Sequence, residues 1–333
     1  MVVFRKIDIP VDKTHESFPL FDWLRFVLAS VVALTHERVI GWEHAGNLAV
    51  QVFFALSGWL IGGILLRTDR HHLPKFYYNR ATRIWIPYAL AVAFLYSVAA
   101  LREGIDGTWL RCLFFDGTFT HNWFINPSQP MPLHGTGNHF WSIAVEEQFY
   151  LAAPLLIVLL PFGRSAIFWT LVAIFAVLSG SWYGSISLGV LAAVSRPKFK
   201  TWQAVIALIL SSAAMYAIDY QIFAPGVAIS VVLLTSRQGP RSRAGEFLGG
   251  VSYPLYLYHW VGIFIANLFM RHSPAVGIVA YVFAVAAGVA AYLVVDRNVM
   301  RWRGRFYRPL AGKVLMGIAY ALFAVGVTYG AAA

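Results

Sequence analysis

The sequence contains little charge and almost no cysteine. Charged residues make up 12% of its 333 residues and hydrophobic residues 59%, whereas an ordinary globular chain is about 25% charged. A soluble chain of this length would form about two domains, and so few charges cannot give both of them a polar surface. The composition therefore excludes a soluble protein and favours the bilayer as the main solvent. The single cysteine, Cys112, excludes an internal disulfide framework, a cysteine-based zinc site and an iron–sulfur cluster.

Apolar runs of roughly membrane-spanning length recur along the chain, each broken by Pro, Gly or a charge cluster. We therefore expect an all-α, polytopic membrane helix bundle with ten or eleven transmembrane helices, in one domain over residues 1–333 with no attached soluble domain. The first 19 residues are polar and do not read as a signal peptide. The expected spans are 20–40, 47–66, 84–101, 140–161, 166–180, 182–194, 201–218, 222–236, 247–270, 275–295 and, as a possible extra terminal helix, 311–331.

The distribution of basic residues predicts the orientation of these spans. A cytoplasmic N-terminus puts 22 of the 26 Lys and Arg residues on the inner side, which is the asymmetry of the positive-inside rule. The net charge of +11 is then explained without nucleic acid. The longest connection, 102–139, lies outside in this arrangement, and a loop of this length between packed spans is usually functional or disordered. Its aromatic and His content argues against disorder.

The first predicted span carries an arginine and a histidine on one face. Arg25 and His36 are eleven residues apart, so they return to within about 20° of the same direction with a rise of about 16 Å. Asp22 adds a carboxylate beside Arg25. Ionisable groups inside a membrane span are costly and usually functional. The alternative is interfacial anchoring of both ends of the helix.

Two features of the next segments allow a structural and a functional interpretation. Small residues in span 47–66 permit close packing, with the first helix as the expected partner. Ser57 in this span is disfavoured as a nucleophile because no base lies beside it in the sequence. Arg80 and Arg83 share a helical face close to Lys75, where they could bind phosphate or only follow the positive-inside rule.

Two adjacent carboxylates, Glu146 and Glu147, lie more than one helical turn inside the span that follows the outer loop. Glu146 lies on a polar stripe with Ser142 and Tyr150, at i, i+4 and i+8, which favours a lined cavity, whereas Glu147 points about 100° away. A weaker stripe joins Ser252, Tyr256 and His259 on one helical face, for which an interfacial aromatic belt is the alternative interpretation.

Five elements stand in the order and spacing of a known family. They are the R-x10-H of FDWLRFVLASVVALTH, then VQVFFALSGWLIGGILL, the R-x-x-R of NRATRIWIP, WSIAVEEQFYLAAPLL and GGVSYPLYLYHW. Through them, residues 18–300 resemble the acyltransferase type-three family of integral membrane O-acyltransferases. The resemblance implies transfer of an acyl group, usually acetyl from acetyl-CoA, to hydroxyls of envelope sugars or small secreted molecules.

The resemblance also implies roles for individual residues. His36 would be the catalytic base or an acyl carrier, with Arg25 and Glu146 in the same catalytic group. Arg80 and Arg83, with nearby Lys75, would hold the phosphates of the donor, and no metal is expected. The remaining candidates, which would contact the acceptor or stabilise the oxyanion, are Trp141, Ser142, Glu147, Tyr150, Tyr256 and His259.

The alternative function is a transporter or flippase of a glycan or small molecule, which the lack of internal repeats disfavours. The expected partners are an acyl-CoA donor, a carbohydrate or glycolipid acceptor and membrane lipid, with no nucleic acid. The expected location is the bacterial inner (plasma) membrane, with multiple passes. The oligomeric state is left open.

Overall fold

The regular secondary structure of the protein is helical throughout the part that the structure describes. The computed structural model describes residues 17–195, 200–269 and 274–332, and the predicted all-α fold is confirmed there. The longer helices are α1 (Pro19–His36), α2 (Ala45–Leu65), α3 (Leu73–Glu103), α6 (Phe140–Pro154), α11 (Arg243–Phe269), α12 (Pro274–Ala291) and α14 (Pro309–Ala332). The shorter ones are α4 (Gly107–Gly117), α5 (His121–Phe124), α7 (Ala166–Leu178), α8 (Tyr183–Ser195), α9 (Thr201–Ala217), α10 (Tyr220–Thr235) and α13 (Arg297–Phe306). The 3₁₀ turns η1 (Arg70–His72) and η2 (Pro132–Gly135) and the π-helical turns η3 (Leu155–Leu159) and η4 (Tyr292–Asp296) complete the fold.

The helices are those of a multi-pass membrane protein. Six helical stretches within the described residues are long and apolar enough to cross a membrane, and α7, α8, α9 and α10 are shorter apolar helices. The count of ten or eleven crossings stays a prediction. Large apolar side chains cover the outside of the molecule: Ile167, Leu171 and Phe175 on α7 are 75%, 62% and 76% exposed. Such a surface fits a lipid environment, since soluble monomers rarely expose large apolar patches.

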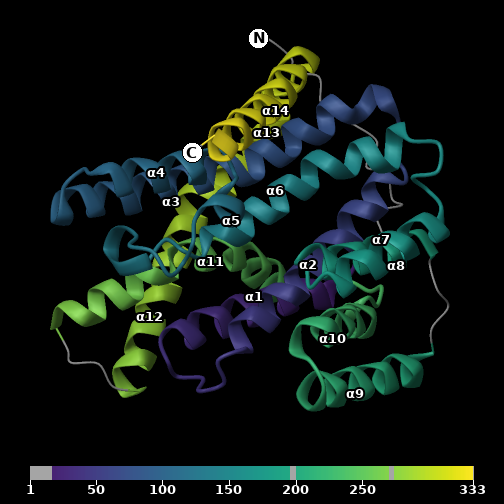
Figure 1. Ribbon diagram of the computed structural model, residues 1–333, viewed down its shortest axis with the longest axis horizontal. Coiled ribbons are helices and arrows are strands. Elements are labelled where there is room, and N and C mark those ends of the chain that lie inside the picture. The colour runs from purple at the N-terminus through teal and green to yellow at the C-terminus, as the bar shows by residue number, and fades with distance from the viewer. Residues whose placement is uncertain (1–16, 196–199, 270–273, 333) are drawn as a thin grey trace, which may run out of the picture.

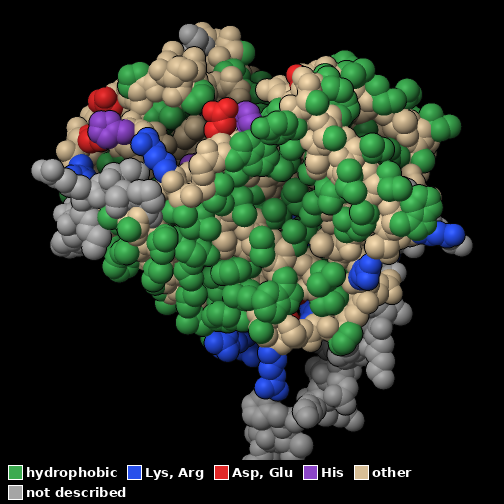
Figure 2. All heavy atoms as spheres, turned by 90° about the horizontal axis from the view of Figure 1, so that it is seen from below, with side chains coloured by type: hydrophobic (Ala, Val, Ile, Leu, Met, Phe, Trp, Pro, Cys, Tyr) green, Lys and Arg blue, Asp and Glu red, His purple; other side chains and the backbone are tan. Residues whose placement is uncertain are grey.

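One face of the molecule shows this apolar surface with charge at its edges. Figure 2 shows hydrophobic side chains across the face, Lys and Arg side chains at its lower edge and at its upper left, and Asp, Glu and His side chains in its upper part. Membrane-spanning helices are expected to form such an apolar surface with charged edges, because charged groups avoid the hydrocarbon core and collect near its two boundaries.

A central group of helices positions the site. Helix α1 packs against α2 and α11, and α2 packs in turn against α8 and α10 (Figure 1). The contact of α2 with α8 is close because a Cβ on Gly58 would lie 2.0 Å from the Ile186 carbonyl oxygen. Gly58 and Gly62 therefore face α8 and not α1, the partner expected from the sequence. Helices α12 and α14 pack outside this group, on α11 and α3.

Three segments are more helical than the sequence suggests. Helix α3 begins at Leu73, with Pro74 in its first turn, and not near residue 84, where the expected span starts, so Arg80 and Arg83 lie well inside the helix. The connection 102–139 contains α4, α5 and η2, and Asp106 starts α4 by accepting a hydrogen bond from the Trp109 backbone N–H at 2.7 Å. Residues 297–306, expected in an inner loop, form α13.

Candidate active site

Helix α1 places a cation near its start and an imidazole at its end. Arg25 Nη1 lies 3.3 Å from Asp22 Oδ1, one turn earlier on the same helix. The other carboxylate oxygen of Asp22 lies 3.4 Å from Nε of Arg241, which precedes α11. Asp22 thus holds two arginines from distant parts of the chain together, while each keeps guanidinium hydrogens free for a further anion.

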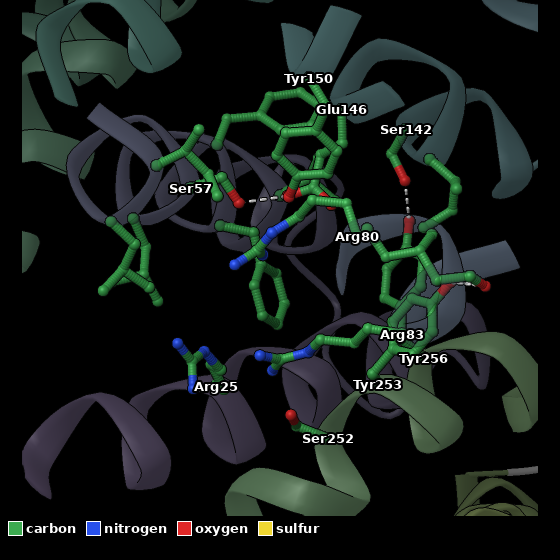
Figure 3. A pocket seen from close by; sticks show the side chains of 18 of the residues that line it. Arg25, Ser57, Arg80, Arg83, Ser142, Glu146, Tyr150, Ser252, Tyr253 and Tyr256 are labelled. Atoms are coloured by element: carbon green, nitrogen blue, oxygen red, sulfur yellow. Dashed lines mark hydrogen bonds between the residues drawn. The ribbon is translucent and has the colours of Figure 1, made fainter. Parts of the chain in front are cut away.

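A cavity of about 290 Å³ opens beside this pair. Its walls come from α1, α2, α3, α6 and α11, and Figure 3 shows Arg25, Arg80 and Arg83 converging on its interior. Arginines predominate over carboxylates in this cavity, and we call it the arginine cavity. Its polar lining residues are Arg25, Ser57, Arg80, Arg83, Ser142, Glu146, Tyr150, Arg241, Ser252, Tyr253 and Tyr256.

Glu146 is the carboxylate of the arginine cavity. It accepts a hydrogen bond from the Ser57 hydroxyl on α2 (Figure 3). A carboxylate therefore does lie beside Ser57 in space, although none is next to it in the sequence. The guanidinium carbon of Arg80 lies 5.8 Å from the ring centroid of Tyr150, within cation–π range. The predicted stripe of Ser142, Glu146 and Tyr150 does line one cavity.

The hydroxyls of Ser142 and Tyr256 form a closed arrangement at the far end of this cavity. Their oxygens lie 2.5 Å apart, and each also lies within 3.2 Å of the His139 carbonyl oxygen. Two hydroxyls hold two protons. One hydrogen forms the hydrogen bond between the two hydroxyls and the other is donated to the carbonyl, so neither is free. Neither hydroxyl can donate to an oxyanion unless this arrangement changes.

A second cavity, of about 410 Å³, contains His36 and is called the histidine cavity. His36 is exposed to it, and His36 Nδ1 lies 2.9 Å from His259 Nε2 on α11. The two rings are nearly parallel and meet edge to edge, with centroids 4.9 Å apart and planes 9° apart. His259 is therefore the partner of this nitrogen. Trp141 also lines the cavity, and its ring packs 4.5 Å from that of Trp182.

Two further residues of the histidine cavity were not foreseen from the sequence. The His139 ring lies 4.7 Å from that of His259, and burial together with nearby His36 lowers the pKa of His139 to about 3. This histidine is therefore neutral. Trp260 is buried, and its indole N–H has no hydrogen-bond partner within the described part of the chain. His139 and Trp260 are next to predicted site residues in the sequence. A single His or Trp beside a motif does not by itself indicate a functional role.

The arginine cavity, the histidine cavity and a third hollow lie next to one another along α1 and share lining residues. Val50 and Tyr256 line both the arginine and the histidine cavity. A hollow of about 540 Å³, here called the vestibule, adjoins the other end and shares Arg25 and Arg241 with the arginine cavity. Trp59, Phe18 and Phe21 add an aromatic wall to the vestibule. Three adjoining cavities thus form a series along α1, with cations at one end and an imidazole at the other.

The predicted site residues divide between these cavities, with two exceptions. Lys75 is exposed and lines none of the three, and Arg241 lies beside Arg25 instead. Glu147 faces away, as its position on the helix predicts, and accepts a hydrogen bond of 2.8 Å from the Trp85 indole. Arg241 was missed because it stands in a loop among other basic residues. Within the described ranges, no group of three or more His, Cys, Asp or Glu could hold a metal ion.

Comparison with known proteins assigns the chain to a family. BcsY of Komagataeibacter xylinus, whose name describes a membrane-bound transacylase, is 26% identical over 88% of this chain and 85% of its own length. The peptidoglycan O-acetyltransferase OatA of Listeria monocytogenes is 31% identical over 41% of this chain and 23% of its own length, so the chain matches under a quarter of that protein. No solved structure matches. Residues 18–297 match the acyltransferase domain that defines the type-three acyltransferases, and the chain belongs to this family of membrane acyltransferases.

Proposed function

We propose that the protein transfers an acyl group, most simply acetyl, from acyl-CoA to a hydroxyl of a carbohydrate acceptor. The observation that supports this best is the series of cavities along α1, with arginines at one end and His36 at the other. An anionic donor and a hydroxyl acceptor need these two environments, one cationic and one able to take a proton.

The donor would enter through the vestibule. Its phosphates would bind the guanidinium groups of Arg25, Arg80, Arg83 and Arg241, which can form bidentate hydrogen bonds with phosphate oxygens. The aromatic wall of the vestibule suits the adenine ring. The pantetheine arm would then follow α1 toward His36, over the rise of about 16 Å that separates Arg25 from His36 on a helix.

The reaction would take place in the histidine cavity. The His36 imidazole accepts the proton of the acceptor hydroxyl, and the acceptor oxygen attacks the thioester carbonyl. The C–S bond then breaks, an ester C–O bond has formed, and the thiolate of CoA takes the proton back from His36, so the enzyme is unchanged. In a variant of this scheme, His36 first carries the acyl group itself. Glu146, bonded to Ser57, would act on the donor side of the site.

The acceptor and the location follow from the relatives and the charge distribution. OatA is a peptidoglycan O-acetyltransferase by name, which favours a carbohydrate or glycolipid acceptor here. The 22 basic residues that fall on one predicted side favour a cytoplasmic N-terminus in a bacterial inner membrane. The donor would then bind from the cytoplasm, and the acceptor would bind beside segment 102–139 on the outer side.

An assay of thiol release from acetyl-CoA by the purified protein in lipid nanodiscs tests this function. We expect His36→Ala to abolish release, since a general base contributes about 10²- to 10⁴-fold. The double variant Arg80→Gln with Arg83→Gln should weaken acetyl-CoA binding about tenfold or more, as charge-assisted hydrogen bonds are lost. The exposed residues His71 and Arg70, changed to Ala and Gln, provide controls. Full activity of His36→Ala would overturn the proposal.

A further inference from the structure

The two histidines of the histidine cavity are linked in a defined order. His259 Nδ1 lies 2.8 Å from the carbonyl oxygen of Tyr256, one turn earlier on α11. His259 Nε2 lies 2.9 Å from His36 Nδ1. A backbone carbonyl, an inner imidazole and an outer imidazole therefore form a chain of two hydrogen bonds, and only the carbonyl has a fixed role, since it can only accept.

The Tyr256 carbonyl determines which ring nitrogens of the two histidines carry a hydrogen. Because the Tyr256 carbonyl accepts, Nδ1 of His259 must carry a hydrogen. His259 is 2% exposed, and the titratable groups that face it are His36, His139 and Tyr256, none of which is an anion. A buried cation without an anionic partner is costly, so His259 is neutral and its Nε2 is an acceptor. His36 Nδ1 must then be the donor.

The free nitrogen of His36 is therefore Nε2. In a neutral imidazole only one nitrogen carries a hydrogen, and Nδ1 of His36 carries it. The ring is exposed to the histidine cavity, so the lone pair of Nε2 is the one that a substrate can meet. The hydrogen bond to His259, whose ring plane is inclined by only 9° to that of His36, restricts rotation of the His36 ring about its side-chain bonds.

We propose that His259 is a positioning residue that holds His36 in the tautomer with Nε2 free to take the acceptor proton. The inference rests on the proposed function and adds a role for a residue on α11 that does not touch the reacting atoms. An orienting partner of this kind fixes both tautomer and ring angle of a functional histidine. Without it, His36 would exchange between tautomers and rotate, and only part of the molecules would be ready to react.

Two substitutions at His259 separate its two hydrogen bonds. The side-chain oxygen of Gln can replace Nε2 and accept from His36, whereas the amide nitrogen of Asn can replace Nδ1 and donate to the Tyr256 carbonyl. We expect His259→Asn to lower kcat for acetyl transfer about 10- to 100-fold with the KM for acetyl-CoA unchanged, because the arginine cavity is untouched. His259→Gln should recover most of that loss. His71→Asn, on the exposed turn η1, controls for the chemistry of the substitution.

The result can overturn the inference without touching the proposed function. If His36→Ala is inactive while His259→Asn keeps the full kcat, the positioning role is wrong and the acyltransferase site stands. Equal losses in the Asn and Gln variants, with folding shown intact by the same melting temperature, would equally rule out the acceptor role of Nε2. Activity in His36→Ala would instead refute the function itself.

Discussion

At the scale of single residues, a buried carboxylate in the connection 102–139 is held by two hydrogen-bond donors. Asp116 is 1% exposed and accepts hydrogen bonds from Tyr96 at 2.6 Å and from His121 at 2.7 Å. The other ring nitrogen of His121 lies 3.4 Å from Asn138 Oδ1. Both ring nitrogens thus face acceptors, which favours the protonated imidazole. This pair ties α4, α5 and the approach to α6 together beside the histidine cavity.

The His121–Asp116 pair predicts a pH dependence of stability. Burial alone would lower the pKa of His121, but the charge of Asp116 and its hydrogen bond raise it above the ordinary value of 6.5. A raised pKa means that the stabilisation is complete below pH 6.5 and is lost as the pH rises through the raised pKa. The melting temperature of the wild type should therefore fall as the pH rises above 6.5 and through the raised pKa.

A substitution isolates the contribution of this pair. His121→Gln should lower the free energy of unfolding by about 1–3 kcal/mol near pH 6, and its deficit should shrink as the pH rises. His71→Gln should leave the wild-type curve in place, because His71 is exposed. Parallel pH curves for the wild type and His121→Gln would show that the pair carries no charge-dependent stability.

At the scale of helices, small residues decide which neighbours can approach the site. A Cβ added at Gly189 on α8 would lie 2.1 Å from the Ala55 carbonyl oxygen on α2, and one at Gly58 would meet α8 equally closely. The backbones of α2 and α8 are therefore in direct contact from both sides, as in other membrane bundles packed through small residues. This contact fixes α2, which carries Ser57 into the arginine cavity.

Adding a methyl group at this contact should force the helices apart. Gly58→Ala and Gly189→Ala should each cost about 1–3 kcal/mol of stability by overpacking, measured by thermal unfolding in detergent. Gly63→Ala is the matched control on the same helix, because a Cβ there would meet nothing within 4 Å. Equal melting temperatures for Gly58→Ala and Gly63→Ala would contradict the close approach.

The helices could be predicted from the sequence more completely than the contacts between them. The expected span 201–218 matches α9, Thr201–Ala217, because a run of apolar residues and its ends are local properties. The pairing of His36 with His259 joins residues 223 positions apart and arises only when α1 docks on α11. That docking depends on shape: Gly249 leaves room for Asp22, whose Cβ would otherwise lie 2.8 Å from a Cβ there. No periodicity reveals such a fit.

At the scale of the whole molecule, the series of cavities gives the protein two chemically different ends. The vestibule and arginine cavity carry the cations, and the histidine cavity carries imidazoles and amides. Orientation in the membrane therefore decides which compartment supplies the donor and which supplies the acceptor.

Cysteine labelling tests that orientation. In a Cys112→Ser background, which removes the only cysteine, we introduce His71→Cys on η1 or Ser128→Cys between α5 and η2, both at exposed positions. A membrane-impermeant maleimide should label residue 128 on intact spheroplasts and residue 71 only after the membrane is opened. The reverse pattern would put the N-terminus outside and exchange the proposed donor and acceptor sides.

The size of the histidine cavity has a consequence for substrate selection. Its volume of about 410 Å³ would have to hold the acyl group of the donor and the reacting part of the acceptor together. Each methylene added to the acyl chain would then take space from the acceptor and not from the rest of the donor, whose phosphates would bind at the other end of α1. Selection for short acyl groups would therefore appear as competition between the two substrates, while the affinity for CoA stays constant.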